Sequence, residues 1–183
     1  PTQWDNIKFF FSYQLNFMYW RYFMWNFAGR QNDIQGHNER EHGNWLTGFN
    51  WFDNNVLGLG DQNLMPDSLK ENKGHNVFYC MPLLLGLLGL FWQAFRGKRG
   101  IQQFWTVFFL FFMTGLAIVI YLNQTPGQPR ERDYAYAGSF YAYAIWCGMG
   151  VAAMYEWLKK LRLSPLGAAA LVSAVGLVVP IQM

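Results

Sequence analysis

The stretch "FWTVFFLFFMTGLAIVIYL", residues 104–122, decides the fold class. It contains no Asp, Glu, Lys, Arg or His over its whole length. A helix needs about 20 predominantly apolar residues to cross the hydrocarbon core of a bilayer, and this stretch is close to that length. A buried helix of a soluble protein is the alternative interpretation, but a second window of similar length also lacks ionisable residues. We therefore predict that residues 104–122 form a membrane-spanning helix.

Three further apolar windows follow the same pattern. Residues 78–95 and 137–155 carry no charge, and a shorter apolar run begins at Leu166. We predict spanning helices at about 78–95, 104–122, 137–157 and 166–183. None is an N-terminal signal peptide with a short apolar core and a cleavage site of small residues. The chain begins without Met and stops within an apolar run, so we expect an internal piece of a longer protein in which the last helix is truncated.

The basic residues predict how these helices are oriented. The turn between windows 78–95 and 104–122 carries three basic residues and no acidic one: Arg96, Lys98 and Arg99. The segment between window 137–155 and the run from Leu166 carries another three, with Glu156 as the only acidic residue: Lys159, Lys160 and Arg162. Loops rich in Lys and Arg stay in the cytoplasm. Residues 1–77 and 123–136 are therefore expected to face outward, which in a bacterial inner membrane is the periplasm. Because topology accounts for so many basic residues, the net charge of +3 calls for no nucleic-acid partner.

The first part of the chain is rich in aromatic residues. Half of the residues in "WDNIKFFFSYQLNFMYWRYFMWNF", residues 4–27, are aromatic. The polar residues fall at helical spacing on one stripe: Asp5, Lys8, Ser12 and Asn16. Trp and Tyr favour the headgroup level, so we predict a helix at about 5–28 that lies in or near the outer interface. A tilted spanning helix is the alternative.

Residues 28–76 turn polar and rich in Gly and Asn, which favours turns over long regular elements. Aromatic residues such as Trp45, Trp51 and Phe52 offer surface to bury, so we expect an ordered external loop packed on the helices. The spacing of His37, His42 and His75 matches no zinc arrangement, and we predict no metal site. The two cysteines, Cys80 and Cys147, lie inside apolar windows, where they are expected to pack as small apolar side chains.

A charged cluster occupies the loop "LNQTPGQPRERDYAYAGSF", residues 122–140. Pro126 and Pro129 have fixed backbone angles and should stiffen the approach to the cluster. Arg130 and Arg132 carry guanidinium groups that bind phosphate oxygens in a bidentate fork, which suits a lipid phosphate at the headgroup level. The alternative is that these arginines pair with Glu131 and Asp133 and hold the loop together.

Two blocks of the sequence resemble a known family. They are "YQLNFMYWRYFMWNFAGRQNDIQG", residues 13–36, and "YLNQTPGQPRERDYAYAGSFYAYAIW", residues 121–146. Both are similar to the signature blocks of domain-of-unknown-function family 2723, large bacterial polytopic membrane proteins related to the transmembrane protein O-mannosyltransferases. The resemblance covers roughly residues 5–160. With the apolar windows, it predicts an all-α membrane protein, a polytopic helical bundle with an aromatic-rich interfacial helix and a long external loop.

The resemblance implies a glycosyltransferase of the GT-C type. Such an enzyme moves a sugar, here expected to be mannose-like, from a polyprenyl-phosphate donor to a protein acceptor on the outer face of the membrane. The matching positions of the first block are Arg21, Arg30, Gln31, Asn32 and Asp33; those of the second are Asn123, Gln124, Arg130, Glu131, Arg132, Asp133 and Tyr134.

Among these positions, we expect eight to bind substrate: Arg130, Arg132, Arg30, Gln31, Asn32, Asn123, Gln124 and Tyr134. Asp33, Glu131 and Asp133 are candidates for the base, although each could equally orient an arginine. The main acidic residue of such enzymes is expected outside this chain, together with any divalent metal. We therefore identify no cofactor within the chain and expect the chain alone to be inactive.

Two other functions compete with this prediction. A transporter would place charged residues within its spanning helices, and the predicted spans have none. A non-catalytic membrane scaffold for envelope protein assembly or export would use the aromatic loop as a docking surface.

Overall fold

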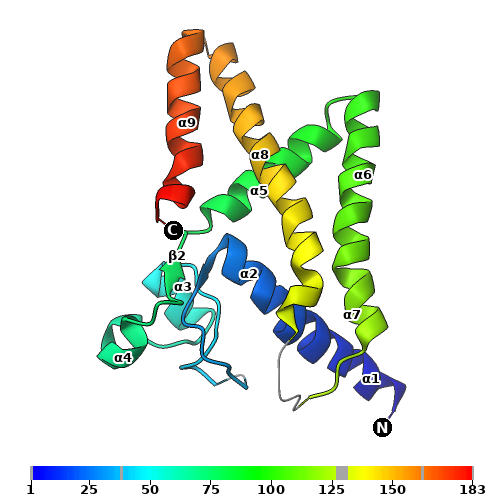
Figure 1. The fold of residues 1–183 in the computed structure, drawn as a ribbon, viewed down its shortest axis with the longest axis vertical. Coiled ribbons are helices and arrows are strands. Elements are labelled where there is room, and N and C mark those ends of the chain that lie inside the picture. Colours follow the sequence, from blue (N-terminus) through cyan, green and yellow to red (C-terminus); the bar gives the residue numbers. More distant parts are fainter. Residues whose placement is uncertain (1, 38, 127–131, 162, 183) are drawn as a thin grey trace.

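The computed structural model describes residues 2–37, 39–126, 132–161 and 163–182, and these residues are mostly helical (Figure 1). The first part of the chain contains α1 (Gln3–Phe9), η1 (Phe10–Trp20), α2 (Arg21–Phe27), β1 (Gly29–Arg30), α3 (Asn50–Asn55), η2 (Gln62–Leu64), α4 (Asp67–Lys70) and β2 (Asn76–Val77). The second part contains α5 (Met81–Ala94), α6 (Lys98–Thr114), α7 (Leu116–Leu122), η3 (Asp133–Tyr136), α8 (Ala137–Lys160) and α9 (Pro165–Gln182). The prediction of an all-α protein is confirmed.

Helix α8 is the centre of the bundle and packs on α5, α6 and α9. Glycines allow α5 and α8 to approach closely, because a Cβ at Gly89 would overlap the backbone carbonyl of Trp146, and one at Gly150 would overlap that of Leu85. The Tyr143 ring lies over Gly86, and its hydroxyl donates to the carbonyl of Leu83 at 2.8 Å. Small residues at matched positions therefore set the contact between α5 and α8.

One helix in the described ranges is long and apolar enough to cross a membrane: α6 and α7 together, Lys98–Leu122, with 25 residues. Helix α5 has 14 residues, or about 21 Å at 1.5 Å per residue, because a turn at Phe78–Cys80 precedes it. The expected span at 78–95 is thus shorter than predicted. One helix of this kind does not establish a polytopic membrane protein. However, only 17% of its most apolar window is buried against the rest of the chain, unlike the core helix of a soluble protein.

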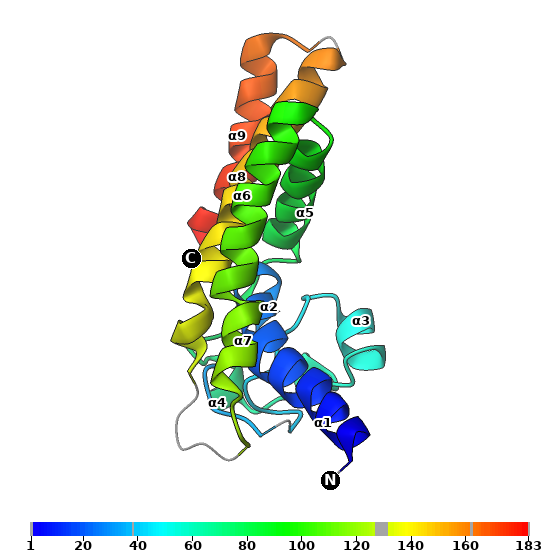
Figure 2. The same ribbon diagram turned by 90° about the vertical axis from the view of Figure 1, so that its right-hand side faces the viewer.

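The bundle has two chemically different ends (Figures 1 and 2). The α5–α6 turn and the C-terminal end of α8 lie together at the top of Figure 1. We call this the basic end, because it carries Arg96, Lys98, Arg99, Lys159 and Lys160. The segment 28–77, helix α1 and η3 lie toward the opposite end, which we call the polar end. Both basic turns therefore lie away from residues 28–77, which we call the polar segment.

Residues Gln3–Phe27 form one continuous helix that crosses the polar end obliquely (Figure 1). A capping box starts it, in which Thr2 and Asp5 exchange hydrogen bonds. Its middle, η1, is a π-helix of 11 residues, far longer than the single π-turns usually found within α-helices. The C-terminal half buries Phe23 and Phe27 against the bundle, whereas Trp4 near the start is exposed. The first half of this helix is thus the more exposed, although Trp20 and Asn26 in the second half are exposed as well.

A two-stranded sheet closes the polar segment at its base. Gly29 pairs with Val77 and Arg30 with Asn76, so the segment leaves and rejoins the bundle at one place. Trp45 is partly buried against the hydrophobic core that includes Phe27 of α2 and Tyr143 of α8. Trp51, expected to bury its ring, is 72% exposed.

Candidate functional site

The two sequence blocks meet at the polar end, although their residues lie far apart in the chain. The side-chain amide of Gln14 donates to the side-chain oxygen of Asn123 at 2.7 Å, across a separation of 109 positions. The same nitrogen donates to the backbone carbonyl of Gln124 at 3.1 Å. Gln14 thus ties the π-helical segment η1 to the chain that leaves α7.

A second contact joins η1 to the start of α8. The Tyr19 hydroxyl donates to Ser139 Oγ at 3.2 Å, and Ser139 donates to the carbonyl of Tyr136 at 2.7 Å. The rings of Tyr19 and Tyr136 meet edge to face with centroids 5.5 Å apart. Burial raises the pKa of both tyrosines to about 12, so both stay neutral at physiological pH. We call the six residues of these two contacts the block junction: Gln14, Tyr19, Asn123, Gln124, Tyr136 and Ser139.

Gln124 is the unusual member of the block junction. Asn123 ends α7 in the left-handed conformation, with φ 41° and ψ 53°, and this turn leads the chain into Gln124. The Gln124 side chain is buried, yet neither its amide nitrogen nor its oxygen has a hydrogen-bond partner in the described part of the chain. A buried polar group without a partner costs roughly 1–3 kcal/mol. A cavity of about 380 Å³ lies beside the junction, lined by Asn6, Phe9, Phe10, Gln14, Ile120 and Asn123.

The charged cluster is only partly described. Arg130 and Glu131 lie outside the described residues, so the predicted pairing among the four charges is not resolved. Arg132 and Asp133 are exposed where η3 begins, and Tyr134 beside them is 63% exposed. Within the residues described, the side chain of Arg132 makes neither a hydrogen bond nor an ion pair. Its guanidinium fork is available to a ligand.

Arg30 presents a second guanidinium group at the polar end. Its Nε donates to the carbonyl of Gly74 at 2.7 Å, and its guanidinium carbon lies 5.3 Å from the centroid of the Trp25 ring. These contacts fix the side chain, while its two terminal nitrogens have no partner among the described residues. Asp33 is exposed, and its backbone N–H donates to the side chain of Asn72 at 3.4 Å.

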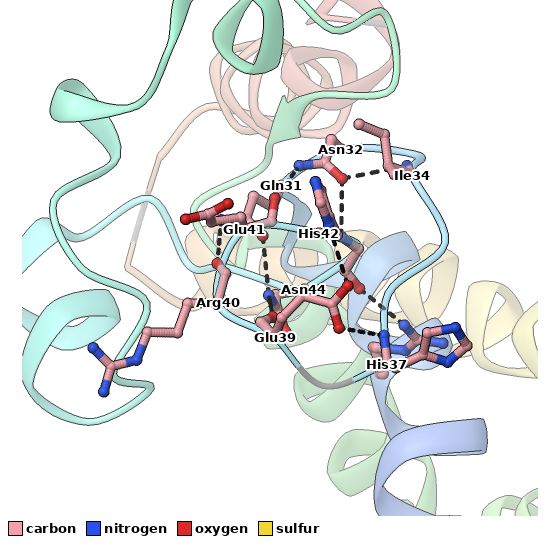
Figure 3. Close-up of polar contacts among 11 residues, drawn as sticks. Gln31, Asn32, Ile34, His37, Glu39, Arg40, Glu41, His42 and Asn44 are labelled. Atoms are coloured by element: carbon pink, nitrogen blue, oxygen red, sulfur yellow. Dashed lines mark hydrogen bonds and ion pairs between the residues drawn. The ribbon is translucent and has the colours of Figure 1, made fainter. Parts of the chain in front are cut away.

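Gln31 and Asn32 are buried at the centre of the loop that Figure 3 shows. The Gln31 amide donates to the Arg40 carbonyl at 3.0 Å and accepts from Asn44 at 3.1 Å. The Asn32 amide donates to the Glu41 carbonyl at 2.8 Å and accepts from the Gly43 N–H at 2.9 Å. Both side chains therefore hold the loop in shape, and their predicted contact with substrate stays a prediction.

The three histidines make contacts within the polar end, with Glu39 and with the backbone of Gln31. Glu39 accepts from the His37 N–H at 2.6 Å and lies 3.2 Å from His42 Nδ1 (Figure 3). Hydrogen bonds from the backbone of Glu39 and His37, with the His42 contact, lower the pKa of Glu39. His75 Nδ1 lies 2.9 Å from the Gln31 carbonyl. In the described ranges no three His, Cys, Asp or Glu side chains gather to hold a metal ion.

The sequence did not single out several residues that build the site. Gln14, Tyr19 and Ser139 were not identified, although Gln14 is a polar residue inside a run of aromatic ones. Arg21 was identified from the first block, and the structure buries it. Its Nε donates to the Phe17 carbonyl at 3.1 Å and its Nη1 to the Gly43 carbonyl at 3.2 Å, so it joins the helix to the loop.

Comparison of the chain with models of protein families, with curated proteins and with solved structures found no match. The resemblance seen in the two blocks therefore stays a prediction, and the case for a function depends on the site itself.

Proposed function

We propose that this chain is part of a membrane-embedded glycosyltransferase of the GT-C type, which moves a mannose-like sugar from a polyprenyl-phosphate donor to a protein acceptor on the outer face. The observation that carries the proposal is the block junction. Two segments that the resemblance selects, and that lie more than a hundred positions apart, meet through Gln14 at one end of the bundle.

A polytopic arrangement in the membrane is the first part of this proposal. Large apolar side chains line the outer surface of α6, including Trp105, Phe109 and Met113, all of them exposed. Soluble monomers rarely expose a contiguous apolar surface of this kind, whereas lipid tails would cover it at no cost. The separation of the basic end from the polar end also supports a cytoplasmic and an outer side.

The chemistry assigned to the polar end follows from two arginines, Arg30 and Arg132, whose terminal nitrogens have no partner among the described residues. Arg30 and Arg132 would grip the donor phosphate, since a guanidinium group binds phosphate oxygens in a bidentate fork and does not lose its charge. Cleavage of the sugar–phosphate bond leaves more negative charge on the phosphate, which nearby donors stabilise. Asp33, Asp133 or Glu131 would accept the proton of the acceptor hydroxyl, unless an acidic residue outside this chain does so.

Membrane topology is tested by cysteine labelling. In a variant without Cys80 and Cys147, a cysteine at Ser68 in α4 is expected to react with a membrane-impermeant thiol reagent in intact spheroplasts. A cysteine at Arg99, at the basic end, is expected to stay protected until the membrane is opened. Both positions are exposed, so accessibility within the protein does not separate them. Labelling of Arg99→Cys with protection of Ser68→Cys would reverse the orientation and remove the external site.

Glycosyl transfer is tested with the purified full-length protein that contains this chain, in detergent or nanodiscs. A polyprenyl-phosphate mannose donor and acceptor peptides rich in Ser and Thr are expected to give glycopeptides that mass spectrometry detects. Deletion of the gene is expected to remove the glycans from surface proteins. Intact surface glycans together with no transfer in vitro would contradict the proposed reaction.

One observation favours the scaffold as a second candidate. Phe49, Trp51 and Leu64 are exposed in the polar segment, and such side chains suit a docking surface for another protein. A scaffold predicts that deletion leaves glycans unchanged and disrupts envelope assembly or export, the opposite of the enzyme's phenotype.

A further inference from the structure

A second cavity lies at the basic end, away from the block junction. It has a volume of about 500 Å³ and lies between α5 and α8. Its lining combines apolar rings with charged groups, among them Phe91, Trp92, Phe95, Arg96, Glu156 and Lys160. The chemistry proposed for the polar end uses none of these residues.

The charged groups in this cavity are held in a defined arrangement. Glu156 Oε1 accepts from Arg96 Nη2 at 3.1 Å, and Glu156 Oε2 accepts from Trp92 Nε1 at 3.2 Å. The Arg96 guanidinium also lies over the Trp92 ring, 4.2 Å from its centroid. Both carboxylate oxygens are thus engaged, while Arg96 keeps further N–H groups free of any partner in the described residues.

The balance of charge selects the kind of ligand. Arg96 and Lys160 contribute two positive charges and Glu156 one negative charge, which leaves one positive charge in the cavity. A phosphodiester carries one negative charge and would neutralise it. The engaged oxygens of Glu156 offer little to the ammonium group of a zwitterionic headgroup. Beside the charges, Phe91 and Phe95 expose apolar rings, and Phe95 is 84% exposed.

We propose that this cavity binds an anionic phospholipid of the phosphatidylglycerol type. The phosphodiester contacts Arg96 and Lys160, and an acyl chain lies along Phe91 and Phe95. Clusters of basic side chains between spanning helices on the cytoplasmic side bind anionic headgroups in this way. The inference rests on the membrane placement in the proposed function and is independent of glycosyl transfer.

The test is native mass spectrometry of the purified protein with equal amounts of phosphatidylglycerol and phosphatidylcholine. Wild type is expected to retain phosphatidylglycerol preferentially. Each basic side chain that contacts the bound headgroup contributes roughly 5-fold, so Arg96→Gln with Lys160→Gln should reduce that preference about 30-fold. Lys160→Gln alone should reduce it about 5-fold, and this variant leaves the Arg96–Glu156 pair intact.

The matched control is Lys98→Gln with Arg99→Gln, which removes two positive charges from the same end outside the cavity. Its lipid preference should stay within about 2-fold of wild type. An equal loss in both double variants would mean diffuse attraction to the whole basic end and would overturn the site. Lipid preference without any sugar transfer would uphold the site and count against the glycosyltransferase. A protein that stays soluble without detergent would overturn both the lipid site and the proposed membrane-embedded glycosyltransferase.

Discussion

Replacing Arg132 with alanine is expected to slow glycosyl transfer about 30- to 1,000-fold while the melting temperature stays the same. The range corresponds to about 2–4 kcal/mol of transition-state stabilisation, the usual cost of removing one donor to a developing negative charge. Arg132 is exposed, and its side chain makes neither a hydrogen bond nor an ion pair in the described residues, so its loss should leave the fold intact. Turnover is measured with the purified full-length protein and normalised to the folded fraction.

Two variants sharpen this test. Arg132→Lys should recover only part of the rate, because an ammonium group cannot reproduce the planar fork. Arg40→Ala is the matched control: Arg40 is another exposed arginine of the polar end, and its side chain points away from the loop contacts in Figure 3. Its rate should stay within about 2-fold of wild type. Near-normal turnover in Arg132→Ala would exclude the phosphate role, and a loss of stability instead of rate would assign Arg132 to the structure of the loop.

Gly150→Ala in α8 is expected to destabilise the protein by about 2–3 kcal/mol, which lowers the melting temperature by roughly 4–12 °C. The added Cβ would overlap the backbone carbonyl of Leu85, and a backbone atom cannot move aside as a side chain can. The favourable effect of alanine on helix formation, about 1 kcal/mol, offsets only part of this cost.

Gly148 supplies the control two residues away on the same helix. A Cβ there would meet no atom within 4 Å, so Gly148→Ala should be neutral or slightly stabilising. Thermal unfolding of the three proteins in one detergent compares them directly. Equal melting temperatures for the two alanine variants would mean that α5 and α8 do not pack as closely as the structure has them.

The helices could largely be predicted from the sequence, because long apolar windows without charge leave few alternatives to a helix. The predicted range 104–122 lies within α6 and α7, and the range 137–157 lies within α8. The start of α5 was missed. Tyr79 and Cys80 both adopt positive φ, 51° and 56°, and no residue type there indicates such a turn.

The site was harder to predict, because its contacts are long-range. Sequence alone does not separate a polar residue that faces a ligand from one that holds a loop. Gln31 and Asn32 lie beside Arg30 in the sequence, yet their amides are occupied by the backbone of residues 40–43 and by Asn44. Gln14 meets Asn123 only after helix packing, and the π-helical turn of η1 changes which face each residue occupies.

The pairing of Gly29 with Val77 closes residues 28–77 into an insert whose two ends leave the bundle side by side. Beyond this ladder, the Arg21–Gly43 hydrogen bond and the packing of Trp45 on the hydrophobic core tie the insert to the helices. Lengthening such a closed insert costs little, since closure entropy grows only with the logarithm of its length. Surface loops on a fixed scaffold can therefore diversify quickly. This architecture would let evolution, or a designer, replace the exposed aromatic surface around Trp51 and leave the helices beneath it untouched.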